Sequence, residues 1–194
     1  MTGAERPEII AILLAAGLSR RFGADKLGAM IDGRAVIERS ASALAACGCS
    51  DKIAVVGPTS VHKPLLLSMG FKVIENAKAD EGISSSIRPG VAHAQSKSAD
   101  GVLIALADMP FVDGAHFDRL IDKAVRSDDG LSFSTAGTRR TPPAVFMARR
   151  LDDLLALTGD AGARMLLKQA DLACGVEAPD AMLRDIDAPS DIET

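Results

Sequence analysis

Near its start the chain reads Ile9-Ile10-Ala11-Ile12-Leu13-Leu14, an uninterrupted apolar run that is rich in β-branched residues. Runs of this kind are typical of strands buried on both faces, as in a parallel sheet. Similar runs recur along the chain, at 53–56, 72–74 and 102–106. Segments with helical spacing lie between them, at 35–47, 61–69, 84–94 and 115–125. Because strands alternate with helices, we predict an α/β fold with a parallel sheet and helices on both of its faces.

The second half of the chain has a less regular pattern. Two apolar stretches, 131–134 and 144–147, are predicted to be strands on either side of a polar turn at 137–140. Helices are expected to follow at 149–157 and 161–170. The sequence has no internal repeat, and its Pro142-Pro143 pair is too short to be a domain linker. We therefore predict a single domain over residues 1–194.

The composition excludes several classes of protein. With 194 residues, 47% hydrophobic and 25% charged, the chain can bury a sizeable core. A net charge of −4 and 3% aromatic residues, without Trp or Tyr, provide neither a basic footprint nor a stacking platform for nucleic acid. No apolar run approaches the roughly 20 residues that span a bilayer, and the N-terminus does not resemble a signal peptide. Three cysteines are too few for a disulfide scaffold, so we expect a cytoplasmic protein.

The first apolar run continues directly into a loop with the sequence Leu14-Ala-Ala-Gly-Leu-Ser-Arg-Arg-Phe-Gly-Ala-Asp-Lys26. Small residues allow the backbone to come close to a ligand, and successive backbone N–H groups can bind phosphate oxygens. Arg20, Arg21 and Lys26 add three positive charges, and Ser19 adds a hydroxyl. We interpret the loop as an anion site, although it matches neither G-x-G-x-x-G nor G-x-x-x-x-G-K-[ST]. The alternative is a plain β–α turn with solvated basic residues.

Acidic residues follow one predicted strand and recur near the end of the sequence. Asp108 comes directly after the apolar stretch 103–107, where a carboxylate beside a phosphate loop is a natural ligand for Mg²⁺. Asp185 and Asp187 would share one face of an extended segment, and one of them, Asp187 by preference, could complete the metal site. The alternatives are a turn or capping role for Asp108 and ordinary turn chemistry for the later pair.

A glycine and three serines open another predicted helix, in the stretch Asp80-Glu-Gly-Ile-Ser-Ser-Ser-Ile-Arg88. A helix N-terminus with free N–H groups and hydroxyls suits a base, a ribose or a phosphate, which makes Gly82, Ser84 and Ser85 candidates for nucleotide binding. The alternative is simple N-capping by one serine. We expect no catalytic role for the three histidines, which fall on predicted helices away from these loops: His62, His93 and His116.

Together these segments resemble the nucleotidyltransferase superfamily of the molybdenum-cofactor type, the MobA-like NTP transferases. The loop matches that family's L-A-[AG]-G-x-S-x-R-x-G-x-x-K signature at Leu14, Ala15, Ala16, Gly17, Ser19, Arg21, Gly23 and Lys26. Three further segments resemble the family's metal-binding Asp segment, its G-x-S-x-S-[LI] segment and its closing D-I-D-T-P-E-D: 107–111, 82–87 and 185–191. Residues 159–164, Gly-Asp-Ala-Gly-Ala-Arg, resemble the G-D-x-G-A-R of the molybdopterin cytidylyltransferase branch.

The resemblance implies a Rossmann-like, three-layer α/β/α fold of the nucleotide-diphospho-sugar transferase type, with a mostly parallel sheet. Guanylyltransferases of the family usually carry L-A-G-G and cytidylyltransferases carry L-A-A-G, so Leu14-Ala15-Ala16-Gly17 points to CTP. The family often has G-x-P before a later strand, where this chain reads Arg140-Thr-Pro-Pro-Ala144. That departure concerns the segment expected to face the second substrate.

The implied reaction is Mg²⁺-dependent transfer of CMP from CTP to the phosphate of molybdopterin, with release of pyrophosphate. In it, Lys26 would contact the α-phosphate, and Arg21 with the loop N–H groups would hold the other phosphates. Asp108 and Asp187 would hold the metal. The catalytic set is thus Arg21, Lys26 and Asp108. The nucleotide-binding set is Leu14, Ala15, Ala16, Gly17, Ser19, Arg20, Gly82, Ser84 and Ser85.

The resemblance also implies partners and leaves alternatives open. A molybdenum hydroxylase of the xanthine dehydrogenase type is the expected recipient of the cofactor, and no nucleic acid or membrane is expected to bind. Two alternatives keep the site and change the substrates: a molybdopterin guanylyltransferase, and a sugar- or polyol-phosphate cytidylyltransferase. A non-catalytic alternative is a nucleotide-binding accessory protein that delivers the cofactor. The complete set of Arg21, Lys26 and Asp108 argues against it, because a sensor need not keep the metal carboxylate.

Overall fold

The computed structural model describes residues 6–17 and 25–192. Seven strands form one sheet in the order β5-β4-β1-β6-β8-β7-β9. Their bounds are Ile9–Ala15 (β1), Asp51–Val56 (β4), Lys72–Glu75 (β5), Gly101–Leu106 (β6), Leu131–Ala136 (β7), Arg139–Met147 (β8) and Gly175–Glu177 (β9). Among these seven strands, β8 alone runs antiparallel to its neighbours, so the sheet is mostly parallel, as predicted.

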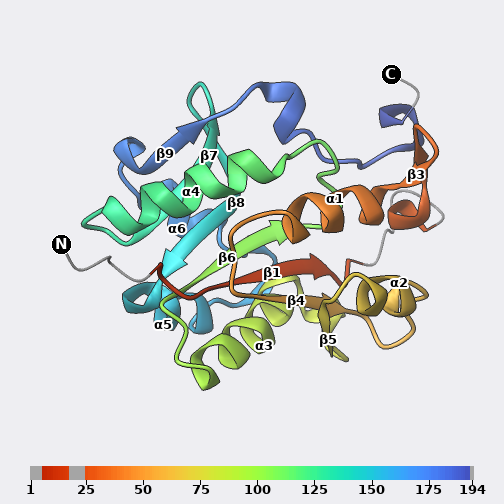
Figure 1. Cartoon of the computed structure of the whole chain (residues 1–194), viewed down its shortest axis with the longest axis horizontal. Helices are drawn as coiled ribbons and strands as arrows, with labels where there is room; N and C mark the ends of the chain where they lie inside the picture. The colour runs from red at the N-terminus through yellow and green to blue at the C-terminus, as the bar shows by residue number, and fades with distance from the viewer. Residues whose placement is uncertain (1–5, 18–24, 193–194) are drawn as a thin grey trace.

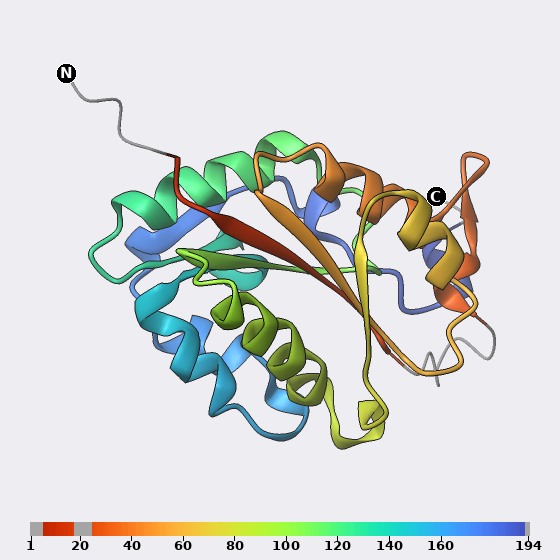
Figure 2. The same cartoon turned by 60° about the horizontal axis from the view of Figure 1, so that its bottom comes forward.

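Helices cover both faces of this sheet (Figure 1). Their bounds are Val36–Ala45 (α1), Lys63–Ser68 (α2), Ile83–Ser96 (α3), Gly114–Arg126 (α4), Leu151–Leu155 (α5) and Arg164–Gln169 (α6). Figure 2 shows α1 and α4 on one face of the sheet and α3 and α5 on the other, which confirms the three-layer α/β/α fold. A short hairpin of β2 (Met30–Ile31) and β3 (Arg34–Ala35) precedes α1. Within the described residues, no helix combines the length and the apolar character needed to cross a bilayer.

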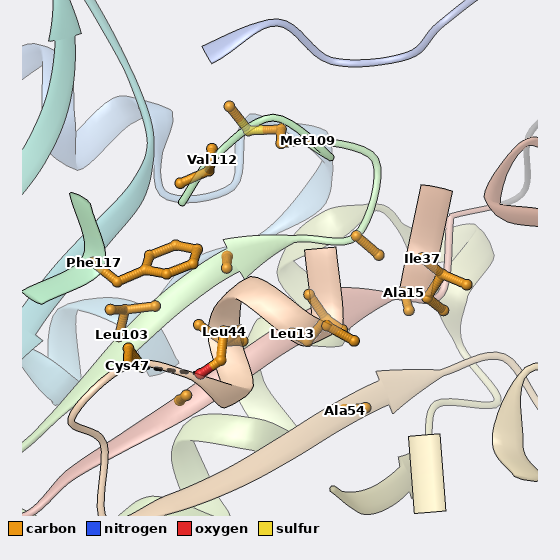
Figure 3. Packing of buried hydrophobic residues seen from close by; sticks show 14 of the residues in the cluster. Leu13, Ala15, Ile37, Leu44, Cys47, Ala54, Leu103, Met109, Val112 and Phe117 are labelled. Carbon is orange, nitrogen blue, oxygen red and sulfur yellow. Dashed lines mark hydrogen bonds between the residues drawn. The ribbon is translucent and has the colours of Figure 1, made fainter. Parts of the chain in front are cut away.

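The side chains of β1 alternate between two clusters of the core. Ile9, Ala11 and Leu13 enter the cluster beneath α1 and α4, and Ile10, Ile12 and Leu14 enter the one beneath α3. Figure 3 shows part of the first cluster, which also contains Leu44 of α1 and Phe117 of α4. Because both faces of the strand are covered, every position is apolar and the strand reads as a continuous run.

The hairpin of β7 and β8 differs from the predicted one. The turn expected at 137–140 consists of Gly137 and Thr138 alone, and β8 begins at Arg139. Gly137 has a φ of +58°, the left-handed conformation that such a short turn requires. Pro142 and Pro143 lie within β8, opposite a register shift in β7. This shift leaves both prolines out of the ladder, which suits residues that have no N–H to donate.

The two helices predicted after β8 are shorter than expected. The segment 149–157 starts within a 3₁₀ turn, Ala148–Arg150, which α5 follows over Leu151–Leu155. In the segment 161–170, Ala161 ends a 3₁₀ turn, Gly159–Ala161, and the α-helix α6 begins only at Arg164. Gly159 and Gly162 precede it with φ values of +65° and +51°. A right-handed helix does not accommodate positive φ, so α6 cannot begin before these glycines.

Candidate active site

The loops after β1, β4 and β6 meet at the carboxyl edge of the sheet. β1 pairs in parallel with β4 and with β6, and just beyond the last paired residues the Ala107 N–H donates to the Leu14 carbonyl at 3.0 Å. Ligands bind at this edge in open α/β sheets, outside the carboxyl ends of the strands. The strand pairing therefore places the start of the signature loop beside Asp108.

Lys26 connects two carboxylates at this edge. Its Nζ lies 2.6 Å from Asp108 Oδ2 and 3.3 Å from Asp187 Oδ1. Lys26 is the first residue of the 3₁₀ turn Lys26–Gly28, and its side chain is 13% exposed, against 54% for that of Asp187. Three of the residues predicted for the site thus come from the start, the middle and the end of the chain and lie in one partly buried cluster.

Backbone hydrogen bonds hold the segment that carries Asp187. The Ile186 N–H donates to the Asp108 carbonyl at 2.9 Å. Asp191 Oδ2 accepts from the N–H of Asp187 at 2.9 Å and from that of Ala188 at 2.7 Å. These two N–H donors lower the pKa of the Asp191 carboxyl. Asp191 therefore shapes the turn that presents Asp187, a role that the sequence did not reveal.

The cluster perturbs the ionisation of its members. Burial lowers the pKa of the Lys26 ammonium, but the Asp108 and Asp187 carboxylates raise it by more, so the pKa lies above its usual value. The pKa of Asp108 is raised, chiefly by burial and also by the nearby charge of Asp185, although the charge and hydrogen bond of Lys26 oppose the rise. One lysine thus does not fully compensate the buried carboxylate, and a further cation would favour its ionised form.

One oxygen of Asp108 is available to such a cation. Asp108 Oδ1 is buried and has no hydrogen-bond partner among the described residues. A buried polar atom of this kind is costly unless a donor or a cation completes it. Mg²⁺ is bound by one or two carboxylates together with phosphates and water, so Asp108 and Asp187 fit such an ion. Within the described part of the chain, no cluster of three or more metal-ligating side chains occurs.

The residues at the start of α3 have different environments. Ser85 Oγ donates to the Gly82 carbonyl at 2.7 Å and accepts from Asn76 Nδ2 at 2.9 Å, so this hydroxyl is engaged within the fold. Ser84 is fully buried, and its Oγ has no hydrogen-bond partner in the part of the chain that is described. At the helix start, the Ser85 hydroxyl is therefore used within the fold, whereas the Ser84 hydroxyl has no hydrogen-bond partner among the described residues.

The segment 159–164 packs directly against the start of α3. A Cβ added to Gly82 would lie 2.5 Å from Asp160 Oδ1 and 2.6 Å from the carbonyl carbon of Gly159. A Cβ added to Gly162 would lie 2.5 Å from Ile83 Cγ2. Such distances leave no room for a side chain at either glycine. Two segments that the sequence singled out separately are therefore packed against each other.

Several predicted site residues lie outside the described residues. Ser19, Arg20 and Arg21 belong to the stretch 18–24, and their roles stay predictions. Among the described residues of the loop, Leu14 places its side chain in the core cluster beneath α3, so its backbone is what a ligand could contact. Ala16 is buried and Gly17 is exposed.

A cleft that the sequence did not predict borders the signature loop. It has a volume of about 320 Å³ and lies between Ala15, Ala16, Gly17 and Asp25 on one side and the 57–62 loop, which joins β4 to α2, on the other. His62 of this loop places Nε2 2.8 Å from Asp25 Oδ2. The expectation that His62 lies away from the site loops is therefore wrong. The sequence indicated that the 57–62 loop could border the site only through its position directly after a predicted parallel strand.

The family follows from a match that covers most of the chain and part of this site. Residues 11–174 match the MobA-like NTP transferase domain, a range that contains Lys26 and Asp108. The chain belongs to the MobA-like NTP transferase family. A MobA-like chain is a nucleotidyltransferase, which confirms the predicted class of enzyme.

Two relatives resemble this MobA-like chain over most of its length. The purine catabolism protein PucB of Bacillus subtilis is 32% identical over 200 residues, which cover 96% of this chain and 95% of PucB. The bifunctional enzyme IspD/IspF of Anaeromyxobacter dehalogenans is 30% identical over 183 residues, which cover 88% of this chain and 46% of that protein. Among solved structures, Rv0371c of Mycobacterium tuberculosis has a TM-score of 0.79 at 21% identity and 96% coverage of both chains, which supports the fold.

Proposed function

We propose that this MobA-like protein is a Mg²⁺-dependent molybdenum cofactor cytidylyltransferase, which transfers CMP from CTP to the phosphate of molybdopterin and releases pyrophosphate. The observation that carries the proposal is the contact of Lys26 with both Asp108 and Asp187 at the carboxyl edge of the sheet. Phosphoryl and nucleotidyl transfer depends on positioning and charge neutralisation more than on covalent catalysis. The Lys26 ammonium and the two carboxylates, beside a loop of small residues, can supply both the positioning and the charge neutralisation.

The proposed reaction is a displacement at phosphorus. An oxygen of the acceptor phosphate attacks the α-phosphorus of CTP, and the bond between that phosphorus and the bridging oxygen breaks. The electron pair of this bond leaves with pyrophosphate. The attacking phosphate is already ionised at neutral pH, so the reaction needs no general base. Lys26 would stabilise the negative charge that develops on the α-phosphate, and Arg21 with the backbone N–H groups of residues 16–19 would hold the other two phosphates.

Asp108 and Asp187 are the proposed Mg²⁺ ligands. Asp108 contributes its buried Oδ1, which lacks a partner among the described residues, and Asp187 contributes a half-exposed carboxylate. When bound there, the ion would neutralise charge on the phosphate oxygens of the nucleotide. The hydrogen bonds from Ile186 to Asp108 and from Asp187 to Asp191 support this pairing, because they hold the second carboxylate at a defined place beside the first.

The proposal of CTP as the nucleotide is supported by the start of the signature loop. This chain has Leu14-Ala15-Ala16-Gly17, the pattern typical of the cytidylyltransferase branch. Ala16 is 6% exposed and borders the cleft beside the loop. A methyl group at this position leaves less room than a glycine, which disfavours the larger purine bases. We propose that the nucleotide binds beside this loop. A contact with Gly82, Ser84 and Ser85 remains part of the proposal; Ser84 is fully buried, and its hydroxyl has no hydrogen-bond partner in the described part of the chain.

The proposal of molybdopterin as the acceptor has two supports. The segment 159–164 resembles the G-D-x-G-A-R of the cytidylyltransferase branch, and it packs against the start of α3. PucB is named a purine catabolism protein, and xanthine, after which the implied hydroxylases are named, is a purine. We propose such a hydroxylase as the recipient of the product.

We also propose a cytoplasmic location and a single domain. The three cysteines carry free thiols, which agrees with a cytoplasmic location. One sheet contains strands from Ile9 to Glu177, which supports a single domain.

A second candidate is a polyol-phosphate cytidylyltransferase. The 30% identity with IspD/IspF over 88% of this chain favours it. A solved structure named 4-diphosphocytidyl-2C-methyl-D-erythritol synthase shares the fold with a TM-score of 0.72 at 18% identity, covering 98% of this chain and 97% of that one. This candidate keeps CTP, Lys26 and the two carboxylates, and it changes only the acceptor.

Pyrophosphate release by the full chain separates the two candidates. The assay contains CTP and Mg²⁺ with either molybdopterin or 2C-methyl-D-erythritol phosphate as the acceptor. We expect release with molybdopterin alone. Release with the polyol phosphate alone would assign the second candidate, and release with neither would refute both. Asp108→Asn should lower the rate by about 10²–10³-fold, whereas Asp122→Asn, a matched change at a carboxylate on α4 that is 69% exposed, should leave it unchanged.

A further inference from the structure

His62 and Asp25 meet across the cleft between the signature loop and the 57–62 loop. His62 Nε2 lies 2.8 Å from Asp25 Oδ2, and the His62 side chain is 13% exposed, against 49% for that of Asp25. The oxygen lies off the direction of the ring N–H bond, so the contact is not an aligned hydrogen bond. The contact joins the end of the signature loop to the loop after β4.

The packing around this contact is close. A Cβ added to Gly28 would lie 2.6 Å from Asp25 Oδ2 and 3.5 Å from His62 Cε1. A side chain at position 28 would therefore displace the Asp25 carboxylate. The absence of a side chain at Gly28 allows Asp25 and the imidazole ring to lie directly against the turn Lys26–Gly28.

His62 is itself fixed to the core of the protein. It immediately precedes α2, and its carbonyl accepts from the Leu66 N–H at 3.1 Å. The Leu66 side chain is fully buried in the cluster beneath α1 and α4. The imidazole ring therefore extends toward Asp25 from an anchored position rather than from a free loop.

Asp25 belongs to the turn that carries Lys26. Its carbonyl accepts from the Gly28 N–H at 3.2 Å, and the Lys26 carbonyl accepts from the Ala29 N–H at 3.3 Å. Because Asp25 precedes Lys26 in this turn, holding the Asp25 side chain constrains the backbone from which the lysine reaches Asp108. The contact with His62 thus acts on Lys26 through one intervening residue.

We propose that His62 is a positioning residue for nucleotidyl transfer, which holds the turn Lys26–Gly28 through Asp25 and so keeps Lys26 directed at the reacting phosphate. The inference rests on the proposed role of Lys26 in the reaction. His62 is not a catalytic residue in this account, because among the described residues its polar contact is with Asp25. Misplacement of a catalytic group by about 1 Å can lower a rate by about 10²-fold, so a modest shift of Lys26 is sufficient for a measurable loss.

The kinetic test compares His62→Ala, Asp25→Ala and the double variant in the full chain. Each single variant should lower kcat for pyrophosphate release by about tenfold and leave KM for CTP nearly unchanged, because Lys26 acts on charge that develops in the transition state. The double variant should lose no more than either single variant, since both changes remove the same contact. The matched control is His93→Ala, a partly exposed histidine on α3, which should retain full activity. Full activity in His62→Ala, or multiplied losses in the double variant, would overturn the proposal.

A second readout does not depend on any acceptor. Acetic anhydride modifies exposed amines, and mass spectrometry reports the rate at each lysine. Acetylation of Lys26 should be several-fold faster in His62→Ala than in the wild type, while that of exposed Lys97 and Lys123 should not change. An unchanged rate at Lys26 would overturn the proposal. The absence of pyrophosphate release from the wild type would instead contradict the proposed function, and the labelling would still decide the positioning. If His62→Ala does not fold, His62→Gln takes its place in both measurements.

Discussion

A drop in pH should destabilise the protein through His116. The side chain of this residue is fully buried between α4 and the sheet. Arg119 donates to its Nδ1 at 2.9 Å, which leaves Nε2 to donate to Ser134 Oγ at 2.8 Å, and the Ser134 hydroxyl donates to the Pro143 carbonyl at 2.9 Å. This network has no place for a second proton on the ring. Burial and the Arg119 charge lower the pKa of His116 to about 4, although Asp113 opposes them.

The size of the effect follows from the difference between the folded and unfolded states. An unfolded histidine has a pKa of about 6.5, so between pH 6.5 and 4 the unfolded chain binds a proton at this site and the folded chain does not. Stability therefore falls as the pH falls through this window. Proton linkage at this single site predicts a loss of about 2 kcal/mol in the free energy of unfolding between pH 7 and pH 5. For a chain of this length that corresponds to a fall of about 4–8 °C in Tm.

Urea unfolding of the wild type and of His116→Gln at pH 7 and pH 5 measures this contribution. The glutamine cannot take up the proton, so the pH-dependent loss should be smaller in the variant by about 2 kcal/mol. Other titrating groups affect both proteins alike and cancel in the difference. His93→Gln is the matched control, because it removes a partly exposed histidine. Between pH 7 and pH 5, the unfolding free energy of this variant should fall almost as much as that of the wild type. Equal losses in the wild type and in His116→Gln would refute the reasoning.

Three further predictions follow from the site and the core. Lys26→Ala should lower kcat/KM for pyrophosphate release by about 10²–10³-fold, because it removes a preorganised charge at the reacting phosphate; an unchanged rate in steady-state assays would remove Lys26 from the site. Ala16→Gly should raise the rate with GTP relative to that with CTP, and an unaltered ratio would show that this methyl group does not select the base. Gly90→Ala would place a Cβ 2.8 Å from Ile12 Cγ2 in the core. It should therefore lower the free energy of unfolding by about 1–3 kcal/mol in urea titrations, and wild-type stability would show that the core adapts.

The α/β architecture could be predicted because strands between two layers of helices have no polar face. β1, β4 and β6 read as short apolar runs, and the helical spacing between them indicates the crossovers. The direction of β8 could not be predicted in this way, because a strand buried on both faces has the same pattern whichever way it runs. The register shift beside Pro142 and Pro143 depends on the partner strand, which the local sequence does not contain.

The grouping of residues at the candidate site was predictable where a motif holds them at fixed spacing. Lys26, Asp108 and Asp187 lie in three motifs, and the structure brings their charged groups within ion-pair distance. His62 was missed because its partner Asp25 is remote in the sequence. The sequence pattern of a histidine at the start of a helix is the same whether its ring faces solvent or a neighbouring loop. Asp191 was missed for a similar reason, since its role depends on a turn of the backbone rather than on a pattern of residue types.

The most direct test of the proposed function is a competition between nucleotides. The wild-type protein is incubated with molybdopterin, Mg²⁺ and equal concentrations of CTP, GTP, UTP and ATP, and the nucleotide attached to the pterin is identified by mass spectrometry. We predict that the CMP adduct predominates and that pyrophosphate appears in equal amount. A predominant GMP adduct would contradict the role assigned to Ala16, and the absence of any adduct would contradict molybdopterin as the acceptor.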